Sequence, residues 1–207
     1  MATASLVLGI DEAGRGPALG EMVLAAVALT SVAARRLRRA GVADSKAFGS
    51  GEAAHRARTE LAAVIRAEAT YAELEICDVE TIDAYVGRGA LNVLERERAL
   101  RLIHGAPPCG RIFADGKRLF GELRASLPHL RAVDRAEGRY VAVAAASILA
   151  KVRRDDLFAA IAARYEPEFG PIRGGGYPNA RTRAFARAHL DRHGCLPREA
   201  RTTWPWG

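Results

Sequence analysis

One stretch near the N-terminus, residues 9–17, constrains this chain more than any other. It reads Gly-Ile-Asp-Glu-Ala-Gly-Arg-Gly-Pro and continues the short aliphatic run Leu6 to Ile10, which is typical of a buried strand. Successive side chains of a regular strand point to opposite faces, so Asp11 and Glu12 share a site only where the strand ends and the backbone turns. An ordinary polar strand end would explain the acidic pair alone. The arginine and two glycines that follow favour a functional site.

The composition indicates one compact globular domain that is large enough to bury a core. The 207 residues are 49% hydrophobic and 27% charged, and no run is long enough for a membrane span or a signal peptide. The three cysteines are widely spaced and form no Cys-x-x-Cys pair, which argues against a disulfide framework and a zinc site. We therefore expect a soluble, cytoplasmic protein.

The charge balance favours a polyanionic partner. The formal net charge is +7, although an arginine-rich composition is equally explained by genomic base composition. Basic charge beside carboxylates is more informative, because phosphate does not approach bare carboxylates without a cation between them; the combination predicts a metal site. His189 and His193 lie four residues apart, but no third zinc-type ligand is near them in the sequence, so we expect both at the surface.

Hydrophobic runs and breakers predict alternating strands and helices. Strands are expected at residues 6–10, 22–29, 71–76, 111–114 and 130–133, the first two forming an antiparallel hairpin. Helices are expected at residues 33–40, 52–69, 79–103, 140–164 and 182–193. The third of these contains Gly87 and Gly89, where it could loosen. The small residues 144–147 favour close packing of the fourth helix on a sheet, and the two tail tryptophans are expected to pack back onto the domain.

A second carboxylate follows another predicted strand in the same way. Asp115 ends the strand at 111–114 and is followed by Gly116 and Lys117, which repeats the order of strand, carboxylate, glycine and cation. An Asp-Gly strand end alone is equally typical of an ordinary turn. Because the ends of adjacent strands lie about 5 Å apart, however, Asp115 has the position that a metal site shared with Asp11 requires.

Three further motifs leave alternatives open. Asp44-Ser45-Lys46 follows a short basic helix and is most simply a polar connector. Lys151 and Asp155 lie four residues apart on one helix face and are most simply an ion pair. Residues 174–176 are all glycine and precede Tyr177; they either let the backbone approach a ligand or form a flexible connector.

Together, the motifs resemble the ribonuclease HII family, the type 2 ribonucleases H, over nearly the whole chain. The resemblance rests on residues 9–17, Asp44-Ser45-Lys46, Asp115-Gly116, residues 145–152 with Arg154-Asp155, and Gly176-Tyr177-Pro178. It implies an α/β fold with an RNase H-like mixed five-stranded sheet, three strands antiparallel and two parallel, flanked by helices and followed by a helical C-terminal region. The catalytic core is then expected over residues 1–165, with a loop and helical segment over 166–207 in the same globular unit.

The resemblance implies a four-carboxylate site that holds two Mg²⁺ or Mn²⁺ ions, formed by Asp11, Glu12, Asp115 and Asp155. Oxygen ligands suit these hard cations. Asp156 is adjacent to Asp155, and the motif match favours Asp155. The implied reaction is hydrolysis on the 5′ side of ribonucleotides in RNA:DNA hybrids, or of single ribonucleotides in duplex DNA, leaving 3′-hydroxyl and 5′-phosphate ends. One ion would activate water and the other would stabilise the leaving oxygen, so no histidine or lysine is needed as a base.

The resemblance also implies the substrate contacts. The turn Gly14-Arg15-Gly16 would contact the 2′-hydroxyl, the group that distinguishes RNA from DNA, and Tyr177 would pack on the following sugar. Lys46 would bind phosphate, and Ser147 and Lys151 are assigned to the substrate as well. We expect nucleic acid as partner, no membrane contact and a monomeric chain. A sliding-clamp partner stays open because no motif identifies one.

The chain departs from the family pattern in four places. Arg135-Ala136-Glu137 stands where Lys-Gly-Asp is usual, and residues 200–204 replace a His-Arg-x-Ser-aromatic pattern. Glu21 stands where proline is common, and Phe48 where leucine is common. None of these positions belongs to the four carboxylates. The departures therefore affect fine substrate preference rather than the chemistry.

Three other protein classes share part of this pattern. Ribonuclease HIII has the same core with an extra N-terminal domain, for which a core that begins at Leu6 leaves no room. A nucleic-acid-binding module without catalysis would not keep the carboxylates, because without metal they repel phosphate. A Holliday-junction resolvase or an integrase would need neither the Gly-Arg-Gly turn nor Tyr177.

Overall fold

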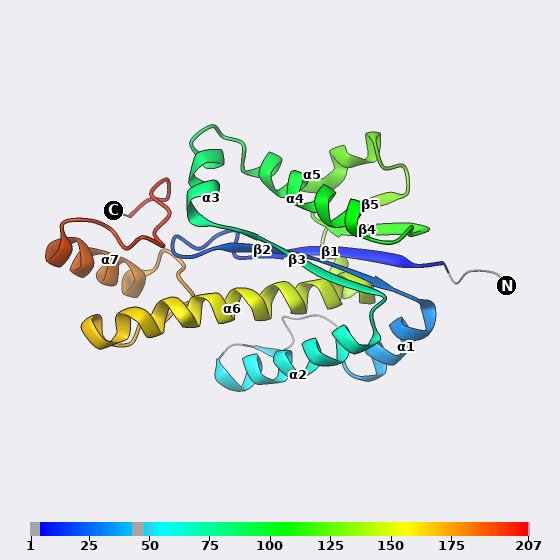
Figure 1. Ribbon diagram of the computed structural model, residues 1–207, viewed down its shortest axis with the longest axis horizontal. Helices are drawn as coiled ribbons and strands as arrows, with labels where there is room; N and C mark the ends of the chain where they lie inside the picture. The colour runs from blue at the N-terminus through cyan, green and yellow to red at the C-terminus, as the bar shows by residue number, and fades with distance from the viewer. Residues whose placement is uncertain (1–4, 43–47, 50, 207) are drawn as a thin grey trace. The chain divides into compact units, whose positions relative to one another are not determined.

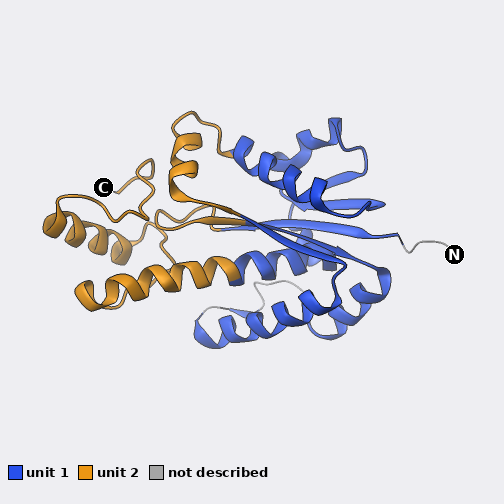
Figure 2. Ribbon diagram, viewed as in Figure 1, with its two compact units in different colours: residues 1–13, 24–75, 92–152 blue, residues 14–23, 76–91, 153–207 orange. Residues whose placement is uncertain are grey.

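The computed structural model describes residues 5–42, 48–49 and 51–206 (Figure 1). Contacts divide the chain into two compact units, each assembled from separate segments (Figure 2). Unit 1 comprises Met1–Ala13, Leu24–Glu75 and Asn92–Val152, and unit 2 comprises Gly14–Val23, Ile76–Leu91 and Arg153–Gly207. This division does not follow chain order. The predicted core over 1–165 with a segment over 166–207 is a different kind of division and stays a prediction.

Five strands form a mixed sheet in the order β3-β2-β1-β4-β5. Their bounds are Val7–Ala13 (β1), Met22–Leu29 (β2), Tyr71–Cys77 (β3), Arg111–Asp115 (β4) and Leu130–Val133 (β5). β1 pairs in parallel with β4, and β4 pairs in parallel with β5. β2 is buried along its whole length, which explains its uninterrupted apolar sequence. The predicted five-stranded RNase H-like sheet is confirmed, with strand ends shifted by at most three residues.

The helices match the predicted pattern except in three places: one predicted helix is divided in two, the helix predicted over 140–164 continues to Phe169, and a short helix at Lys117–Phe120 was not predicted. Their bounds are Ser31–Arg39 (α1), Glu52–Glu68 (α2), Val79–Val86 (α3), Leu91–Gly105 (α4), Lys117–Phe120 (α5), Val141–Phe169 (α6) and Ala180–His193 (α7). The prediction of one helix over 79–103 is wrong, because α3 ends before Gly89, which takes the left-handed backbone conformation, φ +67°. In the described part of the chain, no helix combines the length and apolar character that a membrane span requires.

In unit 1, the small-residue face of α6 packs closely on β1. A Cβ atom on Gly9 would lie 2.1 Å from the carbonyl carbon of Ala142, so only glycine allows the two backbones to meet here. Ala144, Ala145 and Ala146 are buried along the same helix. The predicted close packing of this helix on the sheet is confirmed, and it brings Ser147, the next residue, toward the end of β1.

In unit 2, α6 and α7 share an aromatic core that includes one of the two histidines. His189 is only 8% exposed; its Nδ1 atom lies 2.8 Å from the carbonyl oxygen of Cys195, and its ring stacks on Phe169 with centroids 5.5 Å apart. The expectation that His189 lies at the surface is therefore wrong. Phe185, one helical turn earlier, marks the buried face of α7, whereas His193 is exposed as expected.

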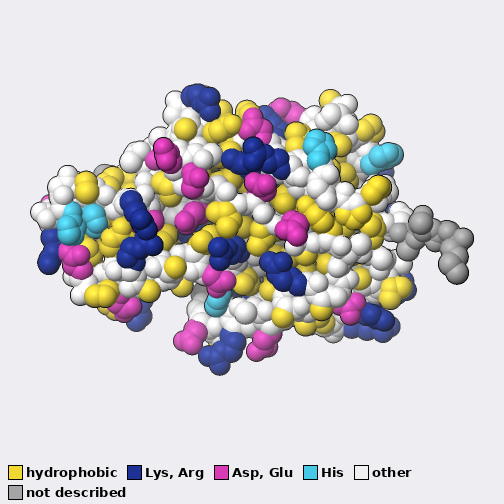
Figure 3. All heavy atoms as spheres, in the orientation of Figure 1, with side chains coloured by type: hydrophobic (Ala, Val, Ile, Leu, Met, Phe, Trp, Pro, Cys, Tyr) yellow, Lys and Arg dark blue, Asp and Glu magenta, His cyan; other side chains and the backbone are white. Residues whose placement is uncertain are grey.

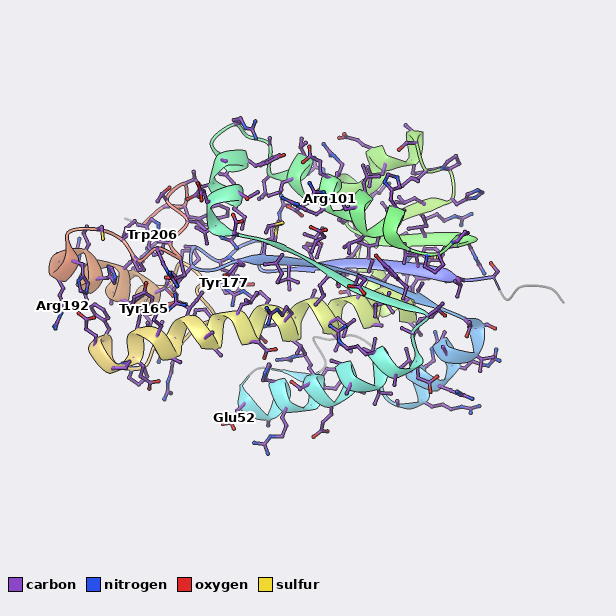
Figure 4. The ribbon with its side chains drawn as sticks, in the orientation of Figure 1. Glu52, Arg101, Tyr165, Tyr177, Arg192 and Trp206 are labelled. Carbon is purple, nitrogen blue, oxygen red and sulfur yellow. The ribbon has the colours of Figure 1, made fainter. Side chains whose placement is uncertain are left out.

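The C-terminal tail packs back onto unit 2, as predicted. Trp206 lies on this tail (Figure 4). Its indole N–H donates to the carbonyl of Arg201 at 2.9 Å, and its ring joins the cluster formed by Leu19, Phe185 and their neighbours. The indole N–H of Trp204 donates to the carbonyl of Gly16 at 3.2 Å. The tail is thus part of the fold around the glycine turn.

Candidate functional site

Three of the four predicted carboxylates lie in unit 1, at the C-terminal ends of two adjacent parallel strands. In the β1–β4 pair Ile10 is opposite Ala114, so the next residues, Asp11 and Asp115, follow at the same edge of the sheet. Adjacent strands lie about 5 Å apart. Glu12 follows Asp11 directly. The strand register therefore puts Asp11 and Asp115 on adjacent strands, while β1 itself runs on through Glu12 to Ala13 and does not end at Ile10 as predicted.

Asp11 is the most buried of these carboxylates, at 6% exposure. Its Oδ1 atom accepts the backbone N–H of Glu12 at 2.9 Å, and the hydroxyl of Ser147 donates to the same carboxylate. Burial, with the negative charges of Glu12 and Asp115, raises the pKa of Asp11 well above its usual value, although the two hydrogen bonds oppose the shift. A nearby cation would relieve this repulsion.

Asp115 is oriented by the turn that follows β5. Its Oδ1 atom accepts the backbone N–H of Ala136 at 2.9 Å. In the same turn Arg135 takes a left-handed backbone with φ 56°, while Ala136 lies in a short 3-10 turn over Ala136–Gly138. The glycine that the family usually has at the Ala136 position is therefore not needed for the backbone conformation here.

The carboxylates of unit 1 have the type of donor atom that binds divalent cations such as Mg²⁺. They offer oxygen donors alone, which Mg²⁺ and Mn²⁺ prefer. Burial is the main cause of the raised pKa of Asp11, and the charges of Glu12 and Asp115, which a cation would offset, add to it. Among the residues that the structure describes, however, no group of three or more His, Cys, Asp or Glu side chains already has the arrangement of a metal site.

The fourth predicted carboxylate, Asp155, lies on α6 within unit 2. Lys151 precedes it by one helical turn and Ser147 by two, so the three residues repeat at helical spacing. Asp155 is half-buried whereas Asp156 is exposed, which favours Asp155 for a role inside a site. Because Asp155 belongs to the other unit, the complete four-carboxylate site stays a prediction.

The structure brings the glycine turn of unit 2 together with Tyr177. Gly14 has φ +89°, and a Cβ atom there would lie 2.8 Å from the carbonyl oxygen of Glu21. A Cβ on Gly16 would lie 3.3 Å from Cε1 of Tyr177, so the aromatic ring lies directly against this glycine. Tyr177 is more than half exposed, at 54%. The two motifs predicted to contact one substrate therefore form one surface.

A buried arginine that the sequence did not single out holds the loop before Tyr177. One terminal nitrogen of Arg154, Nη2, donates to the carbonyls of Leu19 at 3.1 Å and Gly175 at 2.6 Å. The carbonyl of Gly176 accepts the backbone N–H groups of Ala18 and Leu19, at 2.8 and 3.1 Å. A Cβ on Gly176 would lie 2.5 Å from the carbonyl oxygen of Leu19. The glycine triplet is thus closely packed rather than a flexible connector.

A second buried arginine holds the Gly14–Gly16 turn itself. Arg201 is 0% exposed, and its guanidinium donates to the carbonyls of Gly20 at 2.9 Å, Arg15 at 2.9 Å and Gly14 at 2.6 Å. Burial, followed by the charge of Arg154, lowers the pKa of Arg201 to about 10. It stays cationic at neutral pH. The altered C-terminal motif was the one sequence signal that included this arginine.

Two remaining predictions concern residues near these groups. Lys46, with the whole Asp44-Ser45-Lys46 motif, lies outside the described residues, so its phosphate contact stays a prediction. Glu21, which replaces a common proline, contributes a negative charge that favours the ionised forms of Arg154 and Arg201. The departure at Glu21 therefore supplies an acidic group near two buried cations.

On the face shown in Figure 3, basic and acidic side chains are interspersed rather than gathered by sign. The net charge of +7 therefore does not form a single basic patch on that face. The site residues described above, rather than the overall charge, carry the functional argument.

Comparisons with known proteins identify one family over nearly the whole chain. The model of the family "Ribonuclease HII" matches residues 8–205. The ribonuclease HII of Cenarchaeum symbiosum (strain A) is 34% identical over 205 residues, which covers 96% of this chain and 95% of the relative.

Two solved structures have the same fold. The ribonuclease H2 of Pyrococcus horikoshii OT3 aligns with a TM-score of 0.83 and 27% identity, over 97% of this chain and 94% of that one. The enzyme in the PCNA:RNase HII complex from Archaeoglobus fulgidus aligns with a TM-score of 0.80 and 30% identity, over 97% and 95%. Enzymes of this family depend on divalent metal ions and act on nucleic acid. The chain therefore belongs to the ribonuclease HII family and is an endoribonuclease of the ribonuclease H type.

Proposed function

We propose that this enzyme hydrolyses the phosphodiester on the 5′ side of ribonucleotides, in RNA:DNA hybrids and at single ribonucleotides in duplex DNA. The products would carry 3′-hydroxyl and 5′-phosphate ends. The observation that carries the proposal is the parallel register of β1 and β4, which puts Asp11 and Asp115 at one sheet edge beside Glu12. The contact between Gly16 and Tyr177 in unit 2 supports recognition of a sugar.

Asp11, Glu12, Asp115 and Asp155 are the residues that would hold two Mg²⁺ or Mn²⁺ ions. When bound, such ions lower the pKa of an attacking water and stabilise the leaving 3′ oxygen. The carboxylates would serve as ligands and need not transfer protons themselves. The Ser147 hydrogen bond and the Ala136 N–H would keep Asp11 and Asp115 in orientation while the ions bind.

The glycine turn would read the 2′-hydroxyl. Glycine at positions 14 and 16 allows the turn to pack against Glu21 and Tyr177, and the half-exposed ring of Tyr177 offers an apolar face for the sugar that follows. Arg15 lies between the two glycines. Lys46, Ser147 and Lys151 would add contacts to the substrate backbone.

The direct test is an incision assay on a DNA duplex with one embedded ribonucleotide, with the same duplex in all-DNA form as control. Purified protein with Mg²⁺ or Mn²⁺ is expected to make one cut, on the 5′ side of the ribonucleotide, and to leave the all-DNA duplex intact. Ligation and phosphatase treatment of the fragments identify their ends. A cut on the 3′ side, or no cut with either ion, contradicts the proposal.

We also propose a monomeric, cytoplasmic enzyme with its catalytic core over residues 1–165 and a C-terminal segment over 166–207. The Archaeoglobus fulgidus relative was solved as a PCNA:RNase HII complex, and we extend a sliding-clamp partner to this chain. Light scattering after gel filtration, with and without added PCNA, tests the monomeric state and the binding to PCNA. A monomer that shifts to a larger complex with PCNA is the expected result.

A further inference from the structure

The C-terminal segment Arg201–Trp204 holds three successive carbonyl groups of the glycine turn. Arg201 donates to Gly14 at 2.6 Å and to Arg15 at 2.9 Å, and the indole N–H of Trp204 donates to Gly16 at 3.2 Å. All of these residues belong to unit 2. Every carbonyl of the turn is thus bound by one segment of the tail.

The two donors of this segment also contact each other. The guanidinium carbon of Arg201 lies 4.9 Å from the ring centre of Trp204, which is a cation–π geometry. A guanidinium can bind several carbonyls in one plane, whereas a lysine ammonium is a point donor on a flexible stem. The requirement at position 201 is therefore for an arginine and not merely for a positive charge.

Hydrogen bonds also join this segment to α3. The carboxylate of Asp83 accepts the backbone N–H and hydroxyl of Thr202 at 2.6 and 2.8 Å. It also accepts the N–H and hydroxyl of Thr203, at 3.2 and 2.5 Å. Asp83, Thr202 and Thr203 thus limit the movement of the residues between Arg201 and Trp204.

We propose that Arg201 and Trp204 are positioning residues that set the glycine turn for discrimination between ribonucleotide and deoxyribonucleotide. The inference rests on the proposed role of the turn in contacting the 2′-hydroxyl. A hydrogen bond to a hydroxyl is weakened by displacements of less than 1 Å. A displaced turn would also no longer orient the phosphodiester that reacts. Removing the hydrogen bonds to the carbonyls should therefore reduce the preference for ribonucleotide over deoxyribonucleotide more than it reduces the affinity for a duplex in general.

The test compares Arg201→Lys with Arg192→Lys, a matched change on α7, where Arg192 pairs with Glu168. Affinities for the one-ribonucleotide duplex and the all-DNA duplex are measured with Ca²⁺, and kcat and KM with Mg²⁺. Arg201→Lys should bring the affinity ratio of the two duplexes close to one and lower kcat/KM by about 10- to 100-fold, mainly through kcat. Arg192→Lys should keep the wild-type ratio and rate.

Trp204→Phe is the second variant, because it removes one N–H and keeps an aromatic ring at a partly exposed position. It should reduce the affinity ratio by about 3- to 10-fold, as expected for one hydrogen bond. If Arg201→Lys does not fold, Trp204→Phe decides the proposal alone.

Two results would overturn the positioning role. One is a folded variant that keeps the wild-type affinity ratio and kcat; the other is an equal loss on both duplexes, which a merely structural residue would produce. If the proposed function itself is wrong, the wild-type enzyme will show no preference for the duplex with a ribonucleotide. That result is distinct from the two above, and it would contradict the positioning role as well.

Discussion

The two regions that carry the proposed chemistry are built in opposite ways. In unit 1, Asp11 and Asp115 present side chains, and the register of β1 with β4 sets their positions. In unit 2, the Gly14–Gly16 turn presents backbone, and side chains from elsewhere in the chain set its position. Arg201 reaches Arg15 across 186 positions of sequence. The first arrangement comes from secondary structure, and the second depends on tertiary hydrogen bonds.

This difference predicts different responses to mutation. Strand pairing holds the carboxylates even when one side chain changes, so a substitution there should remove chemistry and leave the fold. The turn has no ladder of its own in the described structure, so loss of one glycine or one buried donor should change both its geometry and the stability of unit 2.

The largest expected effect comes from Asp115→Asn. The amide can still accept the Ala136 N–H, but it removes a charged metal ligand, so single-turnover cleavage should fall by about 10³-fold with circular dichroism unchanged. Asp134→Asn is the matched control, because Asp134 is exposed and caps the N–H of Lys117. Near-normal cleavage by Asp115→Asn would remove this residue from the metal site.

Gly14→Ala should have the next largest effect. Alanine at φ +89° is strained, and its Cβ would lie 2.8 Å from the Glu21 carbonyl oxygen. We therefore expect the free energy of unfolding to fall by about 1–3 kcal/mol and the preference for ribonucleotide over deoxyribonucleotide substrate to fall by about 10-fold or more. Gly41→Ala controls for backbone strain, because Gly41 has φ +93° and nothing lies within 4 Å of the added Cβ. Equal substrate preference in both variants would show that the turn does not read the sugar.

Asp11→Asn should separate stability from activity. Because burial and adjacent carboxylates raise the folded-state pKa of Asp11, its contribution to stability is complete below the unfolded pKa and is lost as the pH rises through the folded one. At pH 7 without metal, the asparagine variant should therefore melt about 2–4 °C higher, a shift of roughly 1 kcal/mol for a chain of this size. Cleavage should be lost. A melting temperature of Asp11→Asn below that of the wild type would contradict this prediction and would mean that other groups already offset the repulsion between the carboxylates.

The smallest expected effect is the pH dependence of the tail. Burial opposes ionisation of Asp83, but hydrogen bonds from the hydroxyls and N–H groups of Thr203 and Thr202 outweigh it and lower its pKa. Its stabilising contribution is present above the usual aspartate pKa of about 4 and is lost as the pH falls through the lower folded value. Asp83→Asn should melt below wild type at pH 7, with a gap that narrows below about pH 4. Asp191→Asn, at an exposed position on α7, is the control for the loss of one carboxylate.

Local patterns were sufficient for the sheet, for most helices and for the family. Apolar runs and turn residues located all five strands, and the acidic residues at the ends of two strands identified Asp11 and Asp115 as neighbours. Helix spacing placed Lys151 and Asp155 one turn apart on α6, and the motif favoured Asp155 over Asp156, in agreement with the lower exposure of Asp155. These features depend on residues that are close in sequence, so they can be predicted from it.

Features that depend on distant residues appeared only in the tertiary structure. The burial of His189 required knowledge of what the face of α7 packs against, whereas the break between α3 and α4 has a local cause in the left-handed backbone of Gly89. The glycine turn is the clearest case: the sequence determined that residues 14–16 must bend. Because a hydrogen bond between residues 186 positions apart leaves no periodic signal, only the folded chain decided that Arg201 holds that bend in place.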